Sequence, residues 1–216
     1  MDSGEECDPT VSTNTCAADE VCGAVGTPVA CRCVSEEVCG NCTDDDGDGL
    51  TDFEAPVCCA GSQRFALGIQ RGRLRPRGTL SKFRLKARLE GLGPSDVNPR
   101  VHDVFLQIRP TDSPADALCA RVPAARFTQR GRTFKFRDPH HTAPSAKGID
   151  ALTLVIKPAG SFLRASGRWV QVVTPPHVIS VDVTVGFLEA TIAGDQRCAA
   201  GSHAVTTGSR GGFKFP

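Results

Sequence analysis

Apolar and polar residues alternate through most of the chain from residue 61 onward, and this alternation predicts β-strands. In the segment from Lys82 to Leu89 every second residue is apolar and the residues between are Lys or Arg. A period of two places the apolar side chains on one face of a strand and the basic ones on the other. The pattern predicts further strands at 103–109, 133–137, 151–157 and 179–187. The inward residues expected in the last of these are Ile179, Val181, Val183, Val185 and Phe187.

Glycine and proline separate these segments, as in Arg75-Pro76-Arg77-Gly78 and Gly91-Leu92-Gly93-Pro94. Residues of this kind favour turns. No segment sustains a helical period over about ten residues. We therefore expect residues 61–216 to form an antiparallel β-sandwich of about nine or ten strands.

Several segments of residues 61–216 resemble each other at a nearly fixed spacing, which indicates an internal repeat. An offset of 79 residues superposes Cys119 on Cys198 and the Phe-Lys-Phe sequence at 134–136 on that at 213–215, while an offset of 82 superposes 75–80 on 157–162. The predicted copies are residues 62–138 and 141–216, each with five strands. A single sandwich built from both copies is favoured because five strands alone leave an apolar face uncovered, and Cys119 could then pair with Cys198. In two successive sandwiches the same cysteines would be separate and buried.

The first 60 residues differ in composition from the rest. They contain nine of the 11 cysteines, and 14 Asp and Glu residues against one basic residue, Arg32. The remaining residues contain 24 Lys and Arg and 10 Asp and Glu. The chain thus combines an acidic, cysteine-rich segment with a basic body, and a basic body can bind a polyanion.

The cysteines predict disulfides and an oxidising compartment. The segment 1–40 has too few apolar residues for a core of its own, so crosslinks must stabilise it. Because 11 is odd, at least one cysteine is left over or pairs outside the chain, and adjacent Cys58 and Cys59 are the expected place for it. The disulfide candidates are Cys7, Cys16, Cys22, Cys31, Cys33, Cys39, Cys42, Cys58, Cys59, Cys119 and Cys198.

An acidic loop between these cysteines predicts a calcium site. Its pattern is D-x-D-x-D-G-x-x-D, with side-chain ligands Asp44, Asp46, Asp48 and Asp52 and the carbonyl of Leu50. Calcium prefers six to eight oxygen ligands, and glycine at the sixth position permits the necessary turn. The twelfth position, normally a bidentate acid, is alanine. We therefore expect Ca²⁺ to bind weakly, with a Kd of about 10⁻⁴ to 10⁻³ M. The alternative is a solvated acidic turn.

Two family resemblances carry further expectations. The loop from Asp44 to Asp52 resembles the calcium loops of thrombospondin type-3 repeats, and the string CGNCTDDDGDGLTDFEAPVCC resembles cysteine-framed linkers in secreted or surface proteins of bacteria. These likenesses cover about a tenth of the chain and imply calcium, export and a structural role. The spacing in 1–40 resembles an EGF-like module, which implies Cys7–Cys22, Cys16–Cys31, and Cys33 with Cys39 or Cys42.

These features divide the chain into a disulfide-rich module (1–40), a cysteine-framed calcium linker (41–60) and a β body (61–216). No apolar run is long enough to span a membrane. The N-terminus lacks a basic and then apolar start, so we expect a signal peptide to have been removed or replaced by Met1 in a secreted or cell-surface protein.

Catalysis is not expected. There is no G-x-S-x-G elbow and no H-E-x-x-H helix, and the histidines are expected in exposed turns or at strand ends, with an accidental metal site at adjacent histidines as the alternative. These residues are His102, His140, His141, His177 and His203. Sugar stacking is also not expected, because the chain has no Tyr and its one Trp, Trp169, is predicted to pack in the core.

A run of basic residues is the remaining candidate site. Its members are Arg71, Arg73, Arg75, Arg77, Lys82, Arg84, Lys86 and Arg88. They can bind phosphate, sulfate or uronate groups, or they can simply keep strands soluble and discourage edge pairing. Aromatic residues are not interleaved with this basic run, as a platform for single-stranded nucleic acid would require, and no specific nucleic-acid recognition is expected.

Two functions are therefore predicted. The first is a non-enzymatic extracellular structural or adhesion protein, stiffened by calcium and able to associate with copies of itself. The alternative is a module whose basic sheet face captures acidic polysaccharide or nucleic acid.

Overall fold

The computed structural model describes residues 7, 16, 20–23, 30–59, 61–77, 79–113, 116–172, 178–189, 196–207 and 212–215, without the side chains of Ser62 and Arg77. The chain forms two compact units, Met1–Cys58 and Cys59–Pro216. The acidic loop therefore belongs to the same unit as the cysteine-rich segment before it. His177, expected near a strand end, lies outside the described residues.

A short hairpin and three disulfides organise the first unit. Strands β1 (Glu20–Cys22) and β2 (Cys33–Ser35) pair antiparallel, and a 3₁₀ turn, η1 (Asp52–Glu54), follows the acidic loop. The disulfides are Cys7–Cys22, Cys16–Cys33 and Cys39–Cys58. The last of these brackets the acidic loop, which the sequence predicts to be framed by cysteines, and such a crosslink is worth about 3 kcal/mol through the unfolded state.

The EGF-like pairing is correct for Cys7–Cys22 and wrong for the other two bonds. Cys22 lies directly opposite Cys33 in the hairpin, so the two disulfides leave the hairpin side by side. Cys31 instead lies in the turn before β2, with a φ of 61°. Register therefore selects Cys33 as the partner of Cys16.

The expected leftover cysteine is also misplaced. Cys58 and Cys59 both form disulfides, the latter with Cys198, whereas Cys31 retains its thiol. The Cys59–Cys198 bond rules out the predicted Cys119–Cys198 pair, and Cys119 is itself disulfide-bonded. This crosslink ties the first residue of the second unit to a strand near its C-terminus, 139 residues later.

The second unit is built from one large sheet. The hydrogen-bonded order is β6-β5-β11-β12-β3-β4-β10-β9-β8-β7, and β14 pairs with both β3 and β13. The strands are β3 (Arg64–Arg77), β4 (Leu80–Glu90), β5 (Asp103–Pro110), β6 (Leu118–Val122), β7 (Thr128–Arg130), β8 (Thr133–Arg137), β9 (Ala151–Val155), β10 (Ser161–Val170), β11 (Ser180–Leu188), β12 (Arg197–Ala204), β13 (Thr206–Thr207) and β14 (Phe213–Phe215). Short 3₁₀ turns are η2 (Gly61–Gln63), η3 (Ala124–Arg126) and η4 (Pro144–Ala146).

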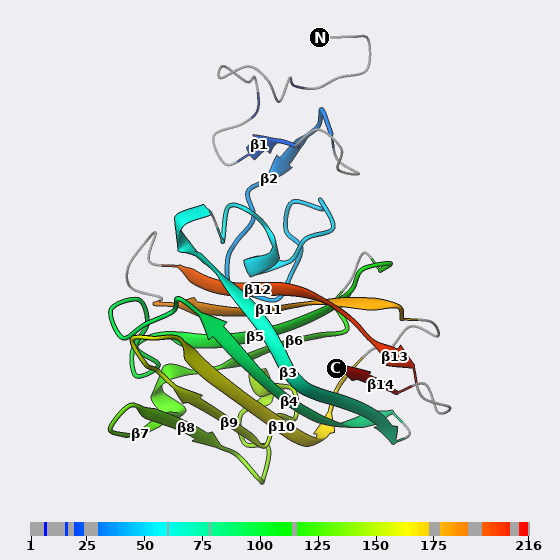
Figure 1. Cartoon of the computed structure of the whole chain (residues 1–216). Coiled ribbons are helices and arrows are strands. Elements are labelled where there is room, and N and C mark those ends of the chain that lie inside the picture. The colour runs from blue at the N-terminus through cyan, green and yellow to red at the C-terminus, as the bar shows by residue number, and fades with distance from the viewer. Residues whose placement is uncertain are drawn as a thin grey trace. The chain divides into compact units, whose positions relative to one another are not determined.

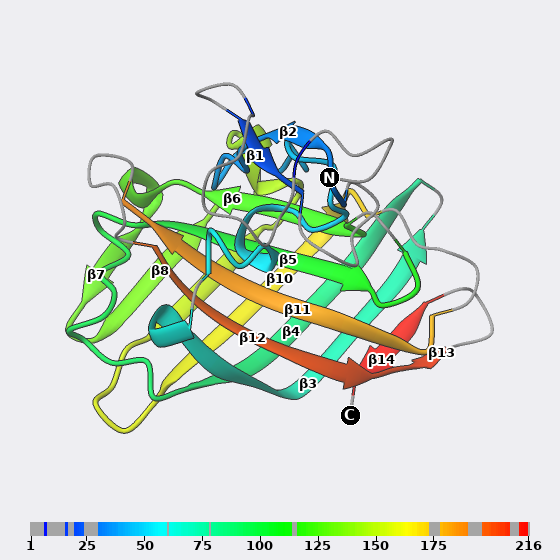
Figure 2. The same cartoon turned by 90° about the horizontal axis from the view of Figure 1, so that it is seen from above.

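The sheet curls so that two layers of strands face each other. Figures 1 and 2 show β5, β11 and β12 crossing over β3, β4 and β10. The layers are continuous through β3, whose first residues pair parallel with β12 while its later residues pair antiparallel with β14. The mainly β class is confirmed, but the sheet is not purely antiparallel, and the two predicted copies interleave their strands in both layers.

Alternating apolar residues of both layers form one core. The inward residues of β4, β9, β10 and β11 are buried together with those of β5 and β6. Val181 to Phe187 follow the predicted alternation, but Ile179 is 78% exposed because β11 begins only at the next residue. The core thus holds the opposite faces of these strands toward solvent, where the basic residues lie.

Candidate functional site

The outward face of β3 and β4 carries three directly opposed pairs of basic residues. The antiparallel register places Arg71 opposite Lys86, Arg73 opposite Arg84 and Arg75 opposite Lys82. Side chains of directly opposed residues share one face and lie within about 5.5 Å at Cβ. Like charges in this position destabilise a sheet. The arrangement therefore concentrates positive charge at the expense of stability.

Neighbouring strands extend this surface in both directions. Lys214 of β14 lies opposite Arg73, and Arg164 of β10 lies opposite Lys86. Beyond them Thr153 of β9 lies between Arg164 and Lys135 of β8. We call the outward side of β14, β3, β4, β10, β9 and β8 the basic face. Its basic residues are Arg71, Arg73, Arg75, Lys82, Arg84, Lys86, Arg88, Lys135, Arg137, Arg164, Arg168 and Lys214.

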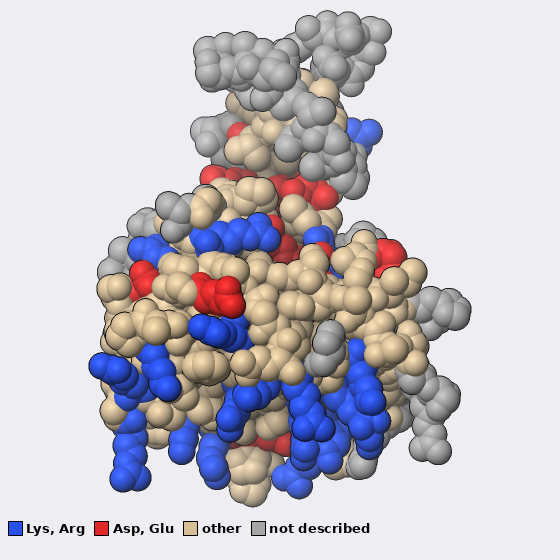
Figure 3. Space-filling view, viewed as in Figure 1, with Lys and Arg blue, Asp and Glu red and all other residues tan. Residues whose placement is uncertain are grey.

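Negative charge is nearly absent from the same surface. Within the described outward positions of these strands, the one carboxylate is Glu90, at the last residue of β4. In Figure 3, Lys and Arg side chains gather over the lower part of the body, where Figure 1 places these strands. Such a one-sign surface attracts anions over a distance of about 10 Å at moderate salt.

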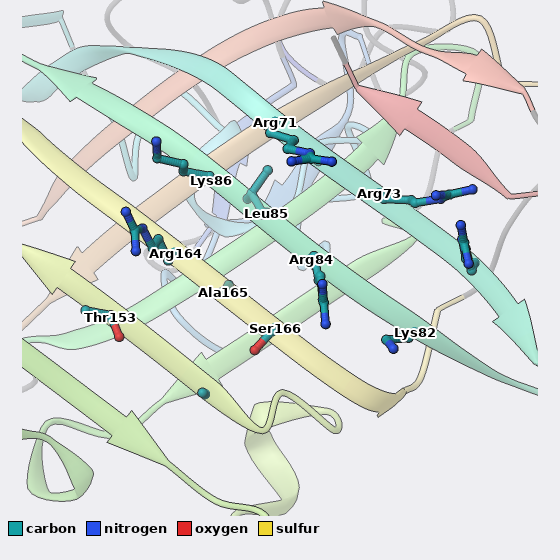
Figure 4. A pocket seen from close by; sticks show the side chains of 13 residues that line it. Arg71, Arg73, Lys82, Arg84, Leu85, Lys86, Thr153, Arg164, Ala165 and Ser166 are labelled. Carbon is teal, nitrogen blue, oxygen red and sulfur yellow. The ribbon is translucent and has the colours of Figure 1, made fainter.

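An open groove of about 500 Å³ runs through the middle of the basic face. Figure 4 shows the side chains of Arg71, Arg84 and Arg164 at this groove, from three adjacent strands. The residues that line it include the small or hydroxyl-bearing side chains of Thr153, Ser166 and Ala151. The groove can therefore offer hydroxyl hydrogen bonds beside its positive charge.

Most of the predicted basic run lies in this site. Seven of the eight residues are described on the basic face, and the side chain of Arg77 is not described. The prediction omitted Lys135, Arg137, Arg164, Arg168 and Lys214, which come from distant segments. The same alternation of apolar and polar residues could have identified them as outward-facing, since each lies between two buried residues or follows one in a strand.

Edge protection does not explain the basic residues of β3 and β4. Each of these strands has hydrogen-bonded neighbours on both sides, and the ends of the sheet order are β6 and β7. Lysine and arginine that discourage pairing belong on edge strands. The expectation that these residues discourage edge pairing is therefore wrong for the central part of the run.

The acidic loop is held by two buried carboxylates. Asp52, fully buried, accepts hydrogen bonds from the backbone N–H groups of Gly40, Asn41 and Cys42 at 2.5, 3.0 and 2.8 Å. Glu37, 4% exposed, accepts from the N–H groups of Asp45 and Asp52 at 2.8 and 2.6 Å. Burial raises the pKa of both carboxyl groups, although the backbone amides oppose this shift.

Three carboxylates converge beside this scaffold. One oxygen each of Glu37, Asp44 and Asp46 lies within 4.8 Å of the others. Oδ1 of Asp44 is buried and has no hydrogen-bond partner among the described residues, while its Oδ2 accepts from Gly49 N at 3.0 Å. Burial, with repulsion from Asp48 and Asp44, raises the pKa of Asp46. Oxygens on opposite sides of a calcium ion are about 4.6 to 5.2 Å apart, so this spacing suits such an ion.

The other predicted ligands have different contacts. Asp48 accepts a hydrogen bond from Leu50 N at 2.7 Å, and Asp46 accepts one from Asp48 N at 3.0 Å, which are the local turns expected of such a loop. Asp52 serves as the backbone anchor described above. Glu37 was missed because it precedes the loop and has no place in its spacing.

The described histidines have separate surroundings. Nδ1 of buried His102 lies 3.1 Å from Asn98 N, and Nε2 of His141 lies 3.3 Å from Asp150. Burial lowers the pKa of His203. His140 is exposed.

Comparison with protein-family models, curated proteins and solved structures finds no match. No helix within the described segments has the length and apolar character needed to cross a membrane. The disulfides fit an extracellular protein.

Proposed function

We propose that the chain is a non-enzymatic extracellular binding protein whose basic face captures an acidic polymer. The observation that carries this proposal is the set of three opposed basic pairs between β3 and β4. A solvent-facing surface gains solubility from charges of mixed sign, whereas like charges opposed in central strands weaken the sheet. A bound polyanion would neutralise that repulsion, and the open groove leaves room for a chain to lie across it.

Retention on immobilised heparin tests the proposal. The wild-type protein should bind at low salt and elute as salt rises, because multiple ionic contacts release counterions. The double variant Arg73→Ser/Arg84→Ser should elute at clearly lower salt. Its control, Arg32→Ser/Arg126→Ser, removes two exposed charges elsewhere and should elute close to wild type. Equal elution of the two double variants, or no retention of wild type, would contradict the proposal.

A second proposed function concerns calcium. We propose that Glu37, Asp44 and Asp46 hold Ca²⁺ and so stabilise the acidic loop, as suits a secreted structural or adhesion protein. The buried, unpartnered Oδ1 of Asp44 supports this, because a desolvated carboxylate oxygen needs a proton, a donor or a cation. Isothermal titration with calcium and protease digestion between residues 40 and 58 test it. Indifference to millimolar calcium in both assays would contradict it.

A further inference from the structure

The single tryptophan of the chain lies on the surface. Trp169 is 50% exposed, in contrast to the core position predicted from its strand. It belongs to β10, whose inward residues Leu163 and Ala165 are buried. A half-exposed indole is a large apolar surface that water solvates poorly, and such residues are enriched at binding sites.

A β-bulge in β10 accounts for this exposure. Gly167 pairs with Phe83 and Val170 pairs with Ser81, so Arg168 and Trp169 together lie opposite the single residue Lys82. Gly167 and Val170 are both buried, and the two residues between them are both exposed. The bulge therefore turns two consecutive side chains outward, onto the side that carries the basic face.

Backbone packing supports the bulge from the neighbouring turn. Gly148, with a φ of 86°, lies so close that a Cβ there would collide with the carbonyl of Trp169, and a Cβ at Gly167 would collide with the carbonyl of Gly148. Gln171 N donates to Lys147 O at 3.0 Å. Beside the indole, Arg168 Nε lies 3.4 Å from Asp150 Oδ2. The outward position of Trp169 is thus built into the fold.

The bulge adjoins the groove of the basic face. Ser166, three residues before Trp169, lines the groove, and so does Lys82, opposite the bulge. The other outward aromatic residue of β10, Phe162, is partly buried and has the Lys157 ammonium 5.7 Å above its ring. Among the described outward residues of these strands, Trp169 is therefore the aromatic side chain with its ring most open to a ligand.

We propose that Trp169 is a ring-stacking subsite at the end of the basic groove, and that the ligand is an acidic polysaccharide. This inference rests on the proposed polymer binding. A sugar ring presents an apolar C–H face that packs on an indole, while its sulfate or carboxylate groups contact Lys82 and Arg84 and its hydroxyls reach Ser166. An acidic polysaccharide presents apolar ring faces and anionic groups in turn along its length. A single indole beside many basic side chains can contact both. A single-stranded nucleic acid is instead bound by successive aromatic rings.

Tryptophan fluorescence gives a specific readout, because the chain has one Trp and no Tyr. Three polyanions are titrated into the wild-type protein: heparin, ring-free inorganic polyphosphate and single-stranded DNA. Heparin should shift the indole emission to shorter wavelength, because stacking removes the ring from water. Polyphosphate should bind with little spectral shift, because it has charge without rings.

Affinities of three variants, measured without fluorescence by calorimetry, complete the test. Trp169→Ala and Trp169→Leu should weaken heparin binding about tenfold, the order of one aromatic stacking contact, while Trp169→Phe retains most of the affinity. Polyphosphate affinity should be the same for all three. Thermal unfolding checks that each variant is folded, which is expected at an exposed position.

The outcomes separate this inference from the proposed function. Heparin binding that is insensitive to Trp169 overturns the stacking subsite and leaves polymer binding intact. Absence of binding to all three polyanions overturns the proposed function itself. A larger effect of Trp169→Ala on DNA than on heparin overturns the assignment of polysaccharide in favour of nucleic acid.

Discussion

Leu106 and Val185 lie directly opposite each other where β5 pairs with β11, and they are 79 residues apart in the chain. This separation equals the offset that superposes the predicted repeats. On either side, Val104 pairs with Phe187 and Ile108 pairs with Val183, as twofold-related copies would pair. In the other layer β4 pairs with β10, and the offset of 82 superposes the segments that lead into these two strands. Gene duplication remains an interpretation, and this register is what it would produce.

The central position of this pair predicts a coupled effect on stability. Both residues are fully buried and share one face of the sheet. Leu106→Ala should lower the free energy of unfolding by about 2 to 5 kcal/mol, through lost burial and the cavity it leaves. The double variant with Val185→Ala should differ from the sum of the single effects by about 0.5 kcal/mol or more. Urea unfolding measures all three, and strict additivity would argue against direct contact.

Removing one charge from an opposed pair should stabilise the body. Arg84→Thr relieves repulsion with Arg73 and introduces a residue that favours strands. We expect a gain of about 0.2 to 1 kcal/mol, seen as a rise in Tm of about 1 to 3 °C that shrinks at high salt. Arg168→Thr is the control, because Arg168 has a carboxylate partner in Asp150 and its loss should give no rise. A lower Tm for Arg84→Thr would mean that the pair is not repulsive.

Calcium binding should depend on a residue outside the acidic loop. Glu37→Gln and Asp44→Asn should each weaken calcium binding about tenfold or more, because each removes a charged ligand from the carboxylate cluster. Glu36→Gln removes the same charge from an exposed neighbour and should leave the affinity unchanged within about twofold. Isothermal titration compares the three. If Glu37→Gln binds as wild type does, the ion is held elsewhere.

His203 should make the body less stable as pH falls. Burial lowers its folded pKa, partly opposed by the Leu67 backbone and by Asp182. The unfolded chain then binds more protons than the folded one, so stability is present above the unfolded pKa of about 6.5 and is lost as pH falls through it. His203→Gln should lessen the drop in Tm between pH 7.5 and 5.5. Parallel pH profiles for the two proteins would show that His203 does not contribute.

The sequence predicts the strands well, because apolar and polar residues must alternate in a strand that is buried on one face only. In β4 the alternating residues from Phe83 to Leu89 are buried as expected. At Trp169 alternation fails, because a bulge inserts one residue and shifts the period, and Gly148, which packs against the bulge, comes from another segment. Trp169 was therefore assigned to the wrong face.

Features that depend on distant segments could not be read in the same way. The acidic loop is visible as a local pattern, but Glu37 joins it only through folding. Disulfide partners depend on register, as Cys33 shows, and Cys59 pairs with a cysteine 139 residues away. Likewise, alternation in the sequence indicates that a residue such as Lys214 faces outward. Only the order of the strands in the folded sheet shows that it shares a surface with Arg73.

The salt dependence of heparin affinity tests the central claim most directly. If about six basic residues of the basic face contact the polymer, the Kd should weaken about 10³-fold between 50 and 200 mM salt. The slope of log K against log salt should fall by about two in Arg73→Ser/Arg84→Ser and stay unchanged in Arg32→Ser/Arg126→Ser. A wild-type affinity that does not change with salt, or an equal loss of slope in both double variants, would contradict binding at this face.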